Sequence, residues 1–339
     1  MKRLFTFLLV VLTIGNTAIN AQDAENNCVD YIPEISLDTR FGYSHDFAEG
    51  AGRFGGNGLL LNIDGKISPN FSYSLNHCLA TYEGGDALGF GNTNWLTLTY
   101  ENDYFYITAG KEDIKVGSFE YDTYDLDSYG EMNSLFWNNC SPWQWGLSAG
   151  WYPADGQTLI LQCTNSPFST YEQFNLFAYA LAWRGEWEHY ESYWSTNLWQ
   201  YETGGYLKSL NLGNRFHAGD FRFDLEYSTR TRGWRDAFKS DFTLMFSPSY
   251  EWDWGRAFAK VGWDKVTEDY LGHEFIGSNV FYGAGAEFFP LKENKDIRLH
   301  AIWASNTHLT ESHYINVGLT WKLDLTRAGK KLFNKIKNN

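Results

Sequence analysis

Polar and apolar residues alternate along short segments through most of this chain. The segment 221–229 is the clearest example, since Phe221 and Phe223 share one face while Arg222 and Asp224 share the other. Successive side chains of a β-strand point to opposite faces, so this segment has an apolar face and a charged face. In a membrane-spanning barrel the apolar face meets lipid and the polar face meets a water-filled interior. In a soluble protein the apolar face packs into the core and the polar face meets the surrounding water.

Sixteen segments of this kind are predicted to be strands, and the connections between them are alternately short and mostly long. The predicted strands are 34–43, 58–67, 70–82, 93–101, 103–111, 143–152, 157–165, 174–184, 187–200, 205–213, 216–230, 240–252, 256–264, 278–289, 296–304 and 313–324. An even number of strands, with short turns at one end and long loops at the other, is typical of bacterial outer-membrane barrels. The pattern predicts an all-β, antiparallel, up-and-down transmembrane barrel over residues 34–324.

The two ends of the chain differ from the alternating region. Residues 1–21 resemble a signal peptide, with Lys2 and Arg3 before an apolar core. Residues 22–33 form a polar leader. Residues 325–339 form a basic tail. This tail could form a short periplasmic helix or remain a frayed end, and the sequence does not decide between these two alternatives. No stretch after residue 21 approaches the roughly 20 apolar residues of a transmembrane helix.

Composition narrows the function further. The net charge is −14, which argues against nucleic acid as a partner. The chain has 15 Trp, 22 Tyr and 25 Phe, a load that suits the aromatic girdles of a membrane barrel and also suits a secreted sugar-binding module. The four cysteines match no zinc spacing and the histidines are scattered, so we expect no cofactor and no metal.

Two short motifs that often accompany catalysis or nucleotide binding lack their structural context. Residues 146–150 fit the G-x-S-x-G pattern of a hydrolase, but they lie within an alternating strand instead of a strand–turn–helix. Residues 50–55 fit G-x-G-x-x-G, but no βαβ unit surrounds them. We therefore expect a strand at the first motif and a glycine-rich loop at the second.

The longest connection, residues 112–142, is too long to be a simple turn. It is acidic and also carries enough aromatic residues to pack against other structure. We expect it to fold into the barrel and narrow the pore, and the alternative is a solvated external loop. The candidate constriction residues are Glu112, Asp113, Glu120, Asp122, Asp125, Asp127 and Glu131.

Charged residues on the inferred inner faces of the strands are the other candidates for function. Rings of charge select ions in pores, although interior acids and bases also pair with each other to support the wall. The candidate lumen-wall residues are Asp38, Arg40, Asp64, Lys66, Arg222, Asp224, Glu226, Arg230, Lys260, Arg298 and Lys322.

A resemblance to a known family rests on residues 65–73 and on residues 107–113 followed by 117–120. Through these stretches the chain resembles Gram-negative sixteen-stranded porins, most closely the group of phosphate-selective porins O and P. The resemblance implies a constriction formed by the loop after the fifth strand, which is where residues 112–142 fall. Phosphate selectivity in that group depends on basic lumen residues, whereas the candidate constriction here is acidic. The resemblance therefore does not extend to phosphate selectivity.

These observations predict an outer-membrane porin for passive diffusion of small hydrophilic solutes or ions, with a preference for cations or neutral solutes. We expect outer-membrane lipid around the barrel and a homotrimer. One alternative is an outer-membrane barrel that is an enzyme or binds lipid or glycan. Another is a secreted all-β binding protein.

Overall fold

The structure, a computed structural model, describes residues 32–79, 91–123, 127–129, 132–139, 143–168, 175–233, 241–268, 276–292, 295–307, 310–327 and 329. One short helix, α2 (Leu135–Asn139), lies between the fifth and sixth strands. The strands are β1 (Glu34–Asp46), β2 (Ala51–Ser68), β3 (Phe71–Cys78), β4 (Thr93–Glu101), β5 (Phe105–Asp113), β6 (Trp143–Ala154), β7 (Gln157–Asn165), β8 (Phe177–Trp187), β9 (Tyr190–Glu202), β10 (Gly205–Ala218), β11 (Phe221–Thr231), β12 (Asp241–Trp252), β13 (Gly255–Val266), β14 (Gly277–Phe288), β15 (Ile297–Asn306) and β16 (Thr310–Asp324).

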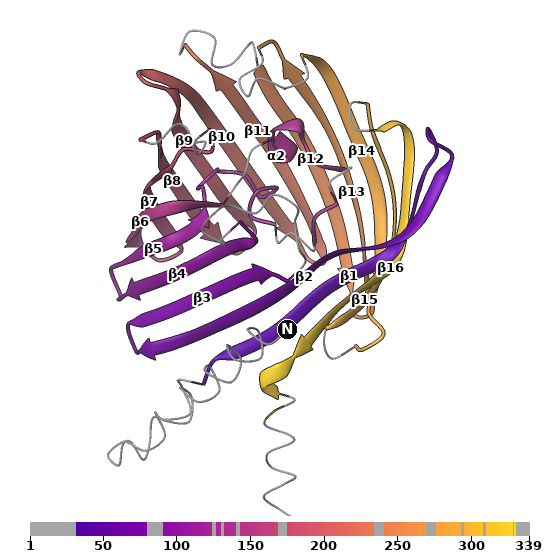
Figure 1. Cartoon of the computed structure of the whole chain (residues 1–339), viewed down its shortest axis with the longest axis horizontal. Helices are drawn as coiled ribbons and strands as arrows, with labels where there is room; N and C mark the ends of the chain where they lie inside the picture. The colour runs from indigo at the N-terminus through magenta and orange to yellow at the C-terminus, as the bar shows by residue number, and fades with distance from the viewer. Residues whose placement is uncertain are drawn as a thin grey trace, which may run out of the picture.

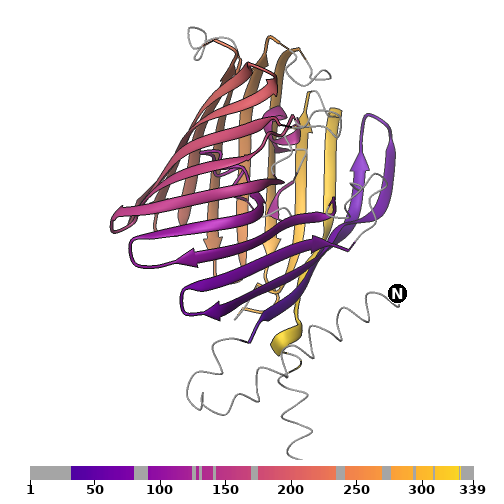
Figure 2. The same cartoon turned by 60° about the vertical axis from the view of Figure 1, so that its left-hand side comes forward.

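Each strand pairs with its neighbours in sequence, and β1 also pairs with β16, so the sheet closes into a barrel (Figures 1 and 2). All pairings are antiparallel. The predicted closed barrel of sixteen strands is confirmed. A sandwich of two sheets is excluded because the described strands form one closed sheet.

Side-chain exposure is inverted relative to that of a water-soluble protein. Outward-facing Leu161 and Leu147 are 60% and 57% exposed, whereas inward-facing Asn76 is fully enclosed. The inward polar groups bond one another in rows across the strands, since Asn76 donates to Asn62 at 2.5 Å and Asn62 donates to Asp38 at 3.1 Å. An apolar exterior with a hydrogen-bonded polar interior is the arrangement that a closed barrel needs in a bilayer.

Two predicted connections are in fact continuations of strands. Glu112 and Asp113 pair with Gln144 and Trp143, so they belong to β5 and not to the long loop. Glu112 points inward, where Ser148 donates a hydrogen bond to it at 3.1 Å. The predicted loop 44–57 is only a turn at residues 47–50, and β1 and β2 extend to either side of it.

Two predicted turns were placed too early. Gly185–Glu186 lies within β8, and Asn214–Arg215 lies within β10, which continues to a turn at Gly219. Arg215 faces inward and binds both carboxylate oxygens of Asp224 on β11, at 2.8 and 3.0 Å. This cross-strand pair favours continued pairing beyond the polar residues that the sequence pattern assigned to a turn.

The main apolar core of the described residues lies inside the barrel, on one side. The described residues of the long connection that are not in a strand, 114–123, 127–129 and 132–139, are called here the inner segment. Its apolar side chains pack against the inner faces of β8–β10. The members of this core are Ile114, Val116, Tyr121, Phe136, Ala178, Trp199 and Leu207.

Beyond the barrel, residues 325–327 and 329 form a helical turn after β16. No helix among the described residues is long and apolar enough to cross a membrane. The predicted signal peptide and most of the predicted leader and tail lie outside the described residues. Cys78 is buried and Cys163 is exposed, and both are free thiols.

Candidate functional site

The inner segment leaves the end of β5 and runs through the interior of the barrel (Figures 1 and 2). Gly117 brings its backbone directly against β9, where its N–H donates to Ser195 Oγ at 2.8 Å. A Cβ at Gly117 would overlap the backbone of Trp194 and Ser195. On the neighbouring strand β10, Gly213 would place a Cβ 3.2 Å from the Gly117 carbonyl oxygen. Close approach therefore depends on two glycines that face each other.

One side of the inner segment makes a dry contact with the wall. The inner face of β8 carries Ala178, Ala180 and Ala182, all buried. These small side chains leave room for Ile114 and Val116, which are 2% and 1% exposed. Water is excluded from this side of the lumen, because apolar side chains fill it.

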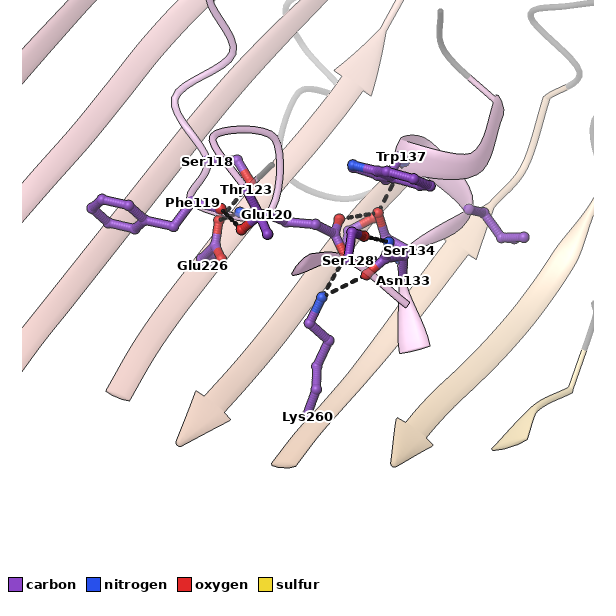
Figure 3. A network of polar contacts seen from close by, with 12 residues as sticks. Ser118, Phe119, Glu120, Thr123, Ser128, Asn133, Ser134, Trp137, Glu226 and Lys260 are labelled. Carbon is purple, nitrogen blue, oxygen red and sulfur yellow. Dashed lines mark hydrogen bonds and ion pairs between the residues drawn. The ribbon is translucent and has the colours of Figure 1, made fainter. Parts of the chain in front are cut away.

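The other side of the inner segment is held by polar contacts from β11 and β13 (Figure 3). Ser118 donates to Glu226 Oε2 at 2.5 Å. Lys260 Nζ lies 2.9 Å from Glu120 Oε1 and 2.9 Å from Asn133 Oδ1. Ser134 completes the network by donating its hydroxyl to Glu120 Oε2. Lys260 therefore joins two distant parts of the inner segment to one strand.

Helix α2 is fixed by a further carboxylate of the wall. Asp264 of β13 accepts a hydrogen bond from Leu135 N at 3.1 Å. Its oxygens also accept from Thr243 and Asn279, at 2.6 and 2.8 Å. The aspartate is thus oriented by both neighbouring strands, β12 and β14, before it caps the first turn of the helix.

Arginines of the wall supply the remaining charged contacts. Arg184 lies 3.2 Å from Asp122, and Arg298 lies 2.5 Å from Asp127. Arg215 stands over the ring of Phe119, 3.9 Å from its centroid. The two ion pairs place acidic residues of the inner segment at contact distance from arginines of the wall. The stacked guanidinium of Arg215 adds a cation–π contact to the same segment.

A cavity of about 390 Å³ remains between the inner segment and strands β10–β13. Its charged lining comes from Glu120, Asp122, Asp127, Arg215, Arg222, Asp224, Glu226, Arg256 and Lys260. A second cavity, of about 610 Å³, lies toward the short turns β10–β11 and β12–β13. Arg222 and Arg256 line both cavities.

The predicted constriction residues divide into three groups. Glu120, Asp122 and Asp127 lie on the inner segment and line the cavity. Glu112 and Asp113 lie at the end of β5, where Lys115 reaches them at 3.4 and 2.8 Å. The remaining two, Asp125 and Glu131, lie outside the described residues.

The predicted lumen-wall residues also separate by position. Four of them line the cavity: Arg222, Asp224, Glu226 and Lys260. Four others make contacts inside the barrel but do not themselves line the cavity. Arg298 pairs with Asp127, Arg40 donates to Ser128 O, Arg230 stacks on Phe136, and Asp38 accepts a hydrogen bond from Asn62. The structure places Asp64, Lys66 and Lys322 in exposed positions, away from the cavity.

Three arginines of the site were missed by the sequence prediction. Arg215 fell in a predicted turn, and Arg184 ended a strand that alternates poorly. Arg256 offered a usable signal, because it lies four residues before Lys260 and therefore on the same face of β13. It pairs with Glu287 of β14 at 3.0 Å.

Burial changes the acid–base behaviour of the inner segment. Burial raises the pKa of Asp122, and the Arg184 guanidinium offsets part of this rise. Burial acts to lower the pKa of Lys115, but the carboxylates of Asp113 and Glu112 outweigh it and hold that pKa well above its usual range. Burial also raises the pKa of Tyr129.

The two short motifs that resemble catalytic and nucleotide-binding patterns both lie in strands of the barrel. Ser148 of the G-x-S-x-G motif lies within β6 and faces inward to Glu112. Residues 51–55 of the G-x-G-x-x-G motif lie in β2, so the glycine-rich loop expected there is a strand. Among the described residues, no group of three or more His, Cys, Asp or Glu side chains could hold a metal ion.

The fold is that of porins and outer-membrane channels. The channel DcaP of Acinetobacter baumannii superimposes with a TM-score of 0.61 and 8% identity, covering 86% of this chain and 96% of that one. An outer membrane protein of Vibrio cholerae, OmpT in a trimer form, gives 0.60 and 9%, covering 86% and 99%. A refined porin gives 0.57 and 13%, covering 86% and 100%. No family model and no curated protein matches this chain.

Proposed function

We propose that this protein is a channel of the outer membrane through which small hydrophilic solutes and ions diffuse passively. The observation that carries the proposal is the inverted barrel, with apolar side chains outside and hydrogen-bonded polar side chains inside. The porin fold supports it, since the similar structures include a porin and an outer-membrane channel. Such a channel performs no chemistry and needs no cofactor.

The path that we propose runs between the inner segment and strands β10–β13. The opposite side is filled by the apolar contact with β8–β10, whereas this side retains a cavity of about 390 Å³ with charged walls. The inner segment then acts as the constriction. Glu120, Asp122 and Asp127 form its acidic edge, and Arg215, Arg222 and Lys260 form the basic edge.

The pairing of these charges bears on selectivity. Glu120 meets Lys260, Asp122 meets Arg184, and Asp127 meets Arg298. Paired charges attract mobile ions less than isolated ones do, so we propose at most a small preference for cations. If the chain were to behave as the phosphate-selective porins do, basic wall residues would dominate and the preference would be for anions.

Outer-membrane location and trimeric assembly are parts of the same proposal. The outward band of large apolar side chains, such as Leu225, Leu244 and Val317, suits contact with lipid. A trimer is supported by the similar Vibrio cholerae protein, whose structure is described as a trimer form. Cross-linking in native membranes would reveal the number of subunits.

The proposal is tested by reconstituting the detergent-purified protein in a planar bilayer under a salt gradient. We expect stepwise conductance with a reversal potential near zero or slightly on the cation side. A reversal potential well on the anion side would keep the channel and would assign selectivity to the wall arginines. A folded barrel without conductance would contradict the proposal.

A further inference from the structure

We propose that the cavity between the inner segment and strands β10–β13 preferentially binds small zwitterions, such as amino acids or short peptides, during their passage. This inference rests on the proposed channel function and adds the class of solute. The cavity presents cationic groups that are not fully paired on one wall and carboxylates with spare oxygens on the other. A solute that carries one charge of each sign can satisfy both walls at once.

The cationic side consists of Arg222 and Arg256. Arg222 lies 4.0 Å from Asp224, but that carboxylate already gives both of its oxygens to Arg215. The Nε atoms of Arg222 and of Arg256 are both buried, and neither has a hydrogen-bond partner among the described residues. Both guanidiniums line the cavity, the Arg222 side chain is 40% exposed, and the Arg256 side chain, which also pairs with Glu287 at 3.0 Å, is 20% exposed. The N–H groups on the cavity side of these guanidiniums can therefore donate to a carboxylate.

The acidic side consists of Asp122 and Asp127 on the inner segment. Asp122 meets Arg184 through Oδ2 alone, at 3.2 Å, and its side chain is 34% exposed. Asp127 meets Arg298 through Oδ1, and its side chain is 33% exposed. An ionised carboxylate can accept several hydrogen bonds, so each residue keeps an oxygen for an ammonium group.

The other charges of the cavity are already occupied within the protein. Glu120 is 2% exposed and is held by Lys260 and Ser134. Glu226 accepts from the Ser118 hydroxyl. A purely anionic solute would be attracted by Arg222 and repelled by Asp122 and Asp127. A purely cationic solute would be attracted by the two aspartates and repelled by the arginine. Each therefore gains one favourable contact and suffers one repulsion, whereas a zwitterion gains two.

The cavity volume is consistent with this class of solute. About 390 Å³ lies within the range of about 300–1,000 Å³ that is usual for sites of small ligands. A dipeptide and a few bridging waters fit such a volume. Water-mediated contacts cost little affinity, so the two charged ends of the solute need not touch both walls directly.

The test uses glycylglycine as the zwitterion, with N-acetylglycylglycine as the anion and glycylglycinamide as the cation. Binding to the detergent-solubilised barrel is measured by saturation-transfer NMR, and permeation is measured by swelling of protein-loaded liposomes. We expect glycylglycine to bind about five-fold more tightly than either analogue, which is the ratio for one partly exposed ion pair. Glycine and triglycine then show which charge separation fits the gap.

Two variants separate the two walls, and a third serves as their control. Arg222→Gln should remove the advantage of glycylglycine over the cation analogue, and Asp122→Asn should remove its advantage over the anion analogue. Lys66→Gln is the matched control, because it removes a lumen-wall cation that does not line the cavity. Equal binding of all three compounds to the unmodified protein would overturn the inference, as would tightest binding by the anion analogue.

Conductance in potassium chloride is recorded on the same samples. Conductance without discrimination among the three compounds would overturn the zwitterion site and leave the channel intact. Discrimination in the NMR measurement without conductance would support the site and contradict the channel. The two proposals therefore fail in different measurements.

Discussion

The two sides of the barrel interior hold the inner segment by different physical means. Strands β8–β10 present buried inner faces on which small or apolar side chains, such as Ala182 and Trp199, alternate with uncharged polar ones such as Asn197, and these faces exclude water. Strands β11–β13 present charged inner faces, including Glu226 and Lys260, and retain a cavity. The dry side combines apolar packing with hydrogen bonds between uncharged groups, from Gly117 N–H to Ser195 Oγ and from Asn197 to the Lys115 carbonyl oxygen, and with the ion pair of Arg184 and Asp122. The charged side holds the segment mainly through ion pairs and hydrogen bonds to charged groups. The dry side positions the segment, and the charged side leaves the space through which solutes can pass.

The largest effect on this comparison is expected from the charged side. Lys260→Met would leave Glu120 without its cation in a nearly enclosed position, since that carboxylate is 2% exposed. Breaking a buried pair in this way costs about 3 kcal/mol. Urea unfolding of the variant in detergent micelles would measure the loss.

Adding Glu120→Gln to Lys260→Met removes the unpaired charge and should restore part of the lost stability. Lys66→Met is the control on an exposed lumen lysine, and it should unfold at the urea concentration of the unmodified protein. Identical unfolding of Lys260→Met and the unmodified protein would show that water in the cavity already replaces the ion pair.

On the dry side, the corresponding change is Gly117→Leu. The new side chain would overlap the backbone of β9, so it would force the inner segment away from the wall. Overpacking of this kind costs about 1–3 kcal/mol. Because the strand pairs are unaffected, we expect a folded barrel with altered single-channel conductance.

Gly55→Leu is the matched control for this change. Gly55 lies in β2, where no atom lies within 4 Å of an added Cβ. It should leave both stability and conductance unchanged. A Gly117→Leu protein with the conductance of the unmodified channel would mean that the dry contact does not position the constriction.

The same contrast explains how far the sequence could predict the structure. Strands with charged inner faces, such as 221–229, alternate cleanly, and the closed barrel followed from them. The strands around Ala178 and Trp199 alternate poorly, because their inner faces pack against the inner segment instead of water. The pattern of a single strand cannot reveal a third element that packs inside the barrel.

The charges of the site were predicted as residue types but not as pairs. Glu120 and Lys260 both stood among the candidates, yet their contact joins positions 140 residues apart. Arg215 was missed because a polar pair, Asn214–Arg215, resembles a turn. The pairing of Arg215 with Asp224 follows from the register of β10 and β11, in which these two residues stand opposite each other. Register depends on cross-strand contacts, which are set by the whole sheet.

A smaller effect is expected at the acidic edge. Asp122→Asn combined with Asp127→Asn removes two partly exposed carboxylates of the cavity, after which Arg184 keeps only Glu186 and Arg298 keeps only Glu287 as an ion-pair partner among the described residues. The reversal potential under a salt gradient should move toward the anion side. Exposed pairs contribute about 0–1 kcal/mol, so stability should change little. An unchanged reversal potential would remove these carboxylates from the selectivity of the channel.

The smallest expected effect is a dependence on pH. Burial raises the pKa of Asp122, so this residue should protonate at a higher pH than an ordinary aspartate, whose pKa is about 3.9. For a raised carboxyl pKa, the stabilising contribution is complete below the unfolded value and is lost as the pH rises through the folded value. Protonation of Asp122 on acidification should therefore shift the reversal potential toward anions without loosening the inner segment. Recordings from neutral pH down to about pH 4 would show this shift, and Asp122→Asn should lack it. A shift of equal size in the variant would assign it to another group and would leave Asp122 with a structural role beside Arg184.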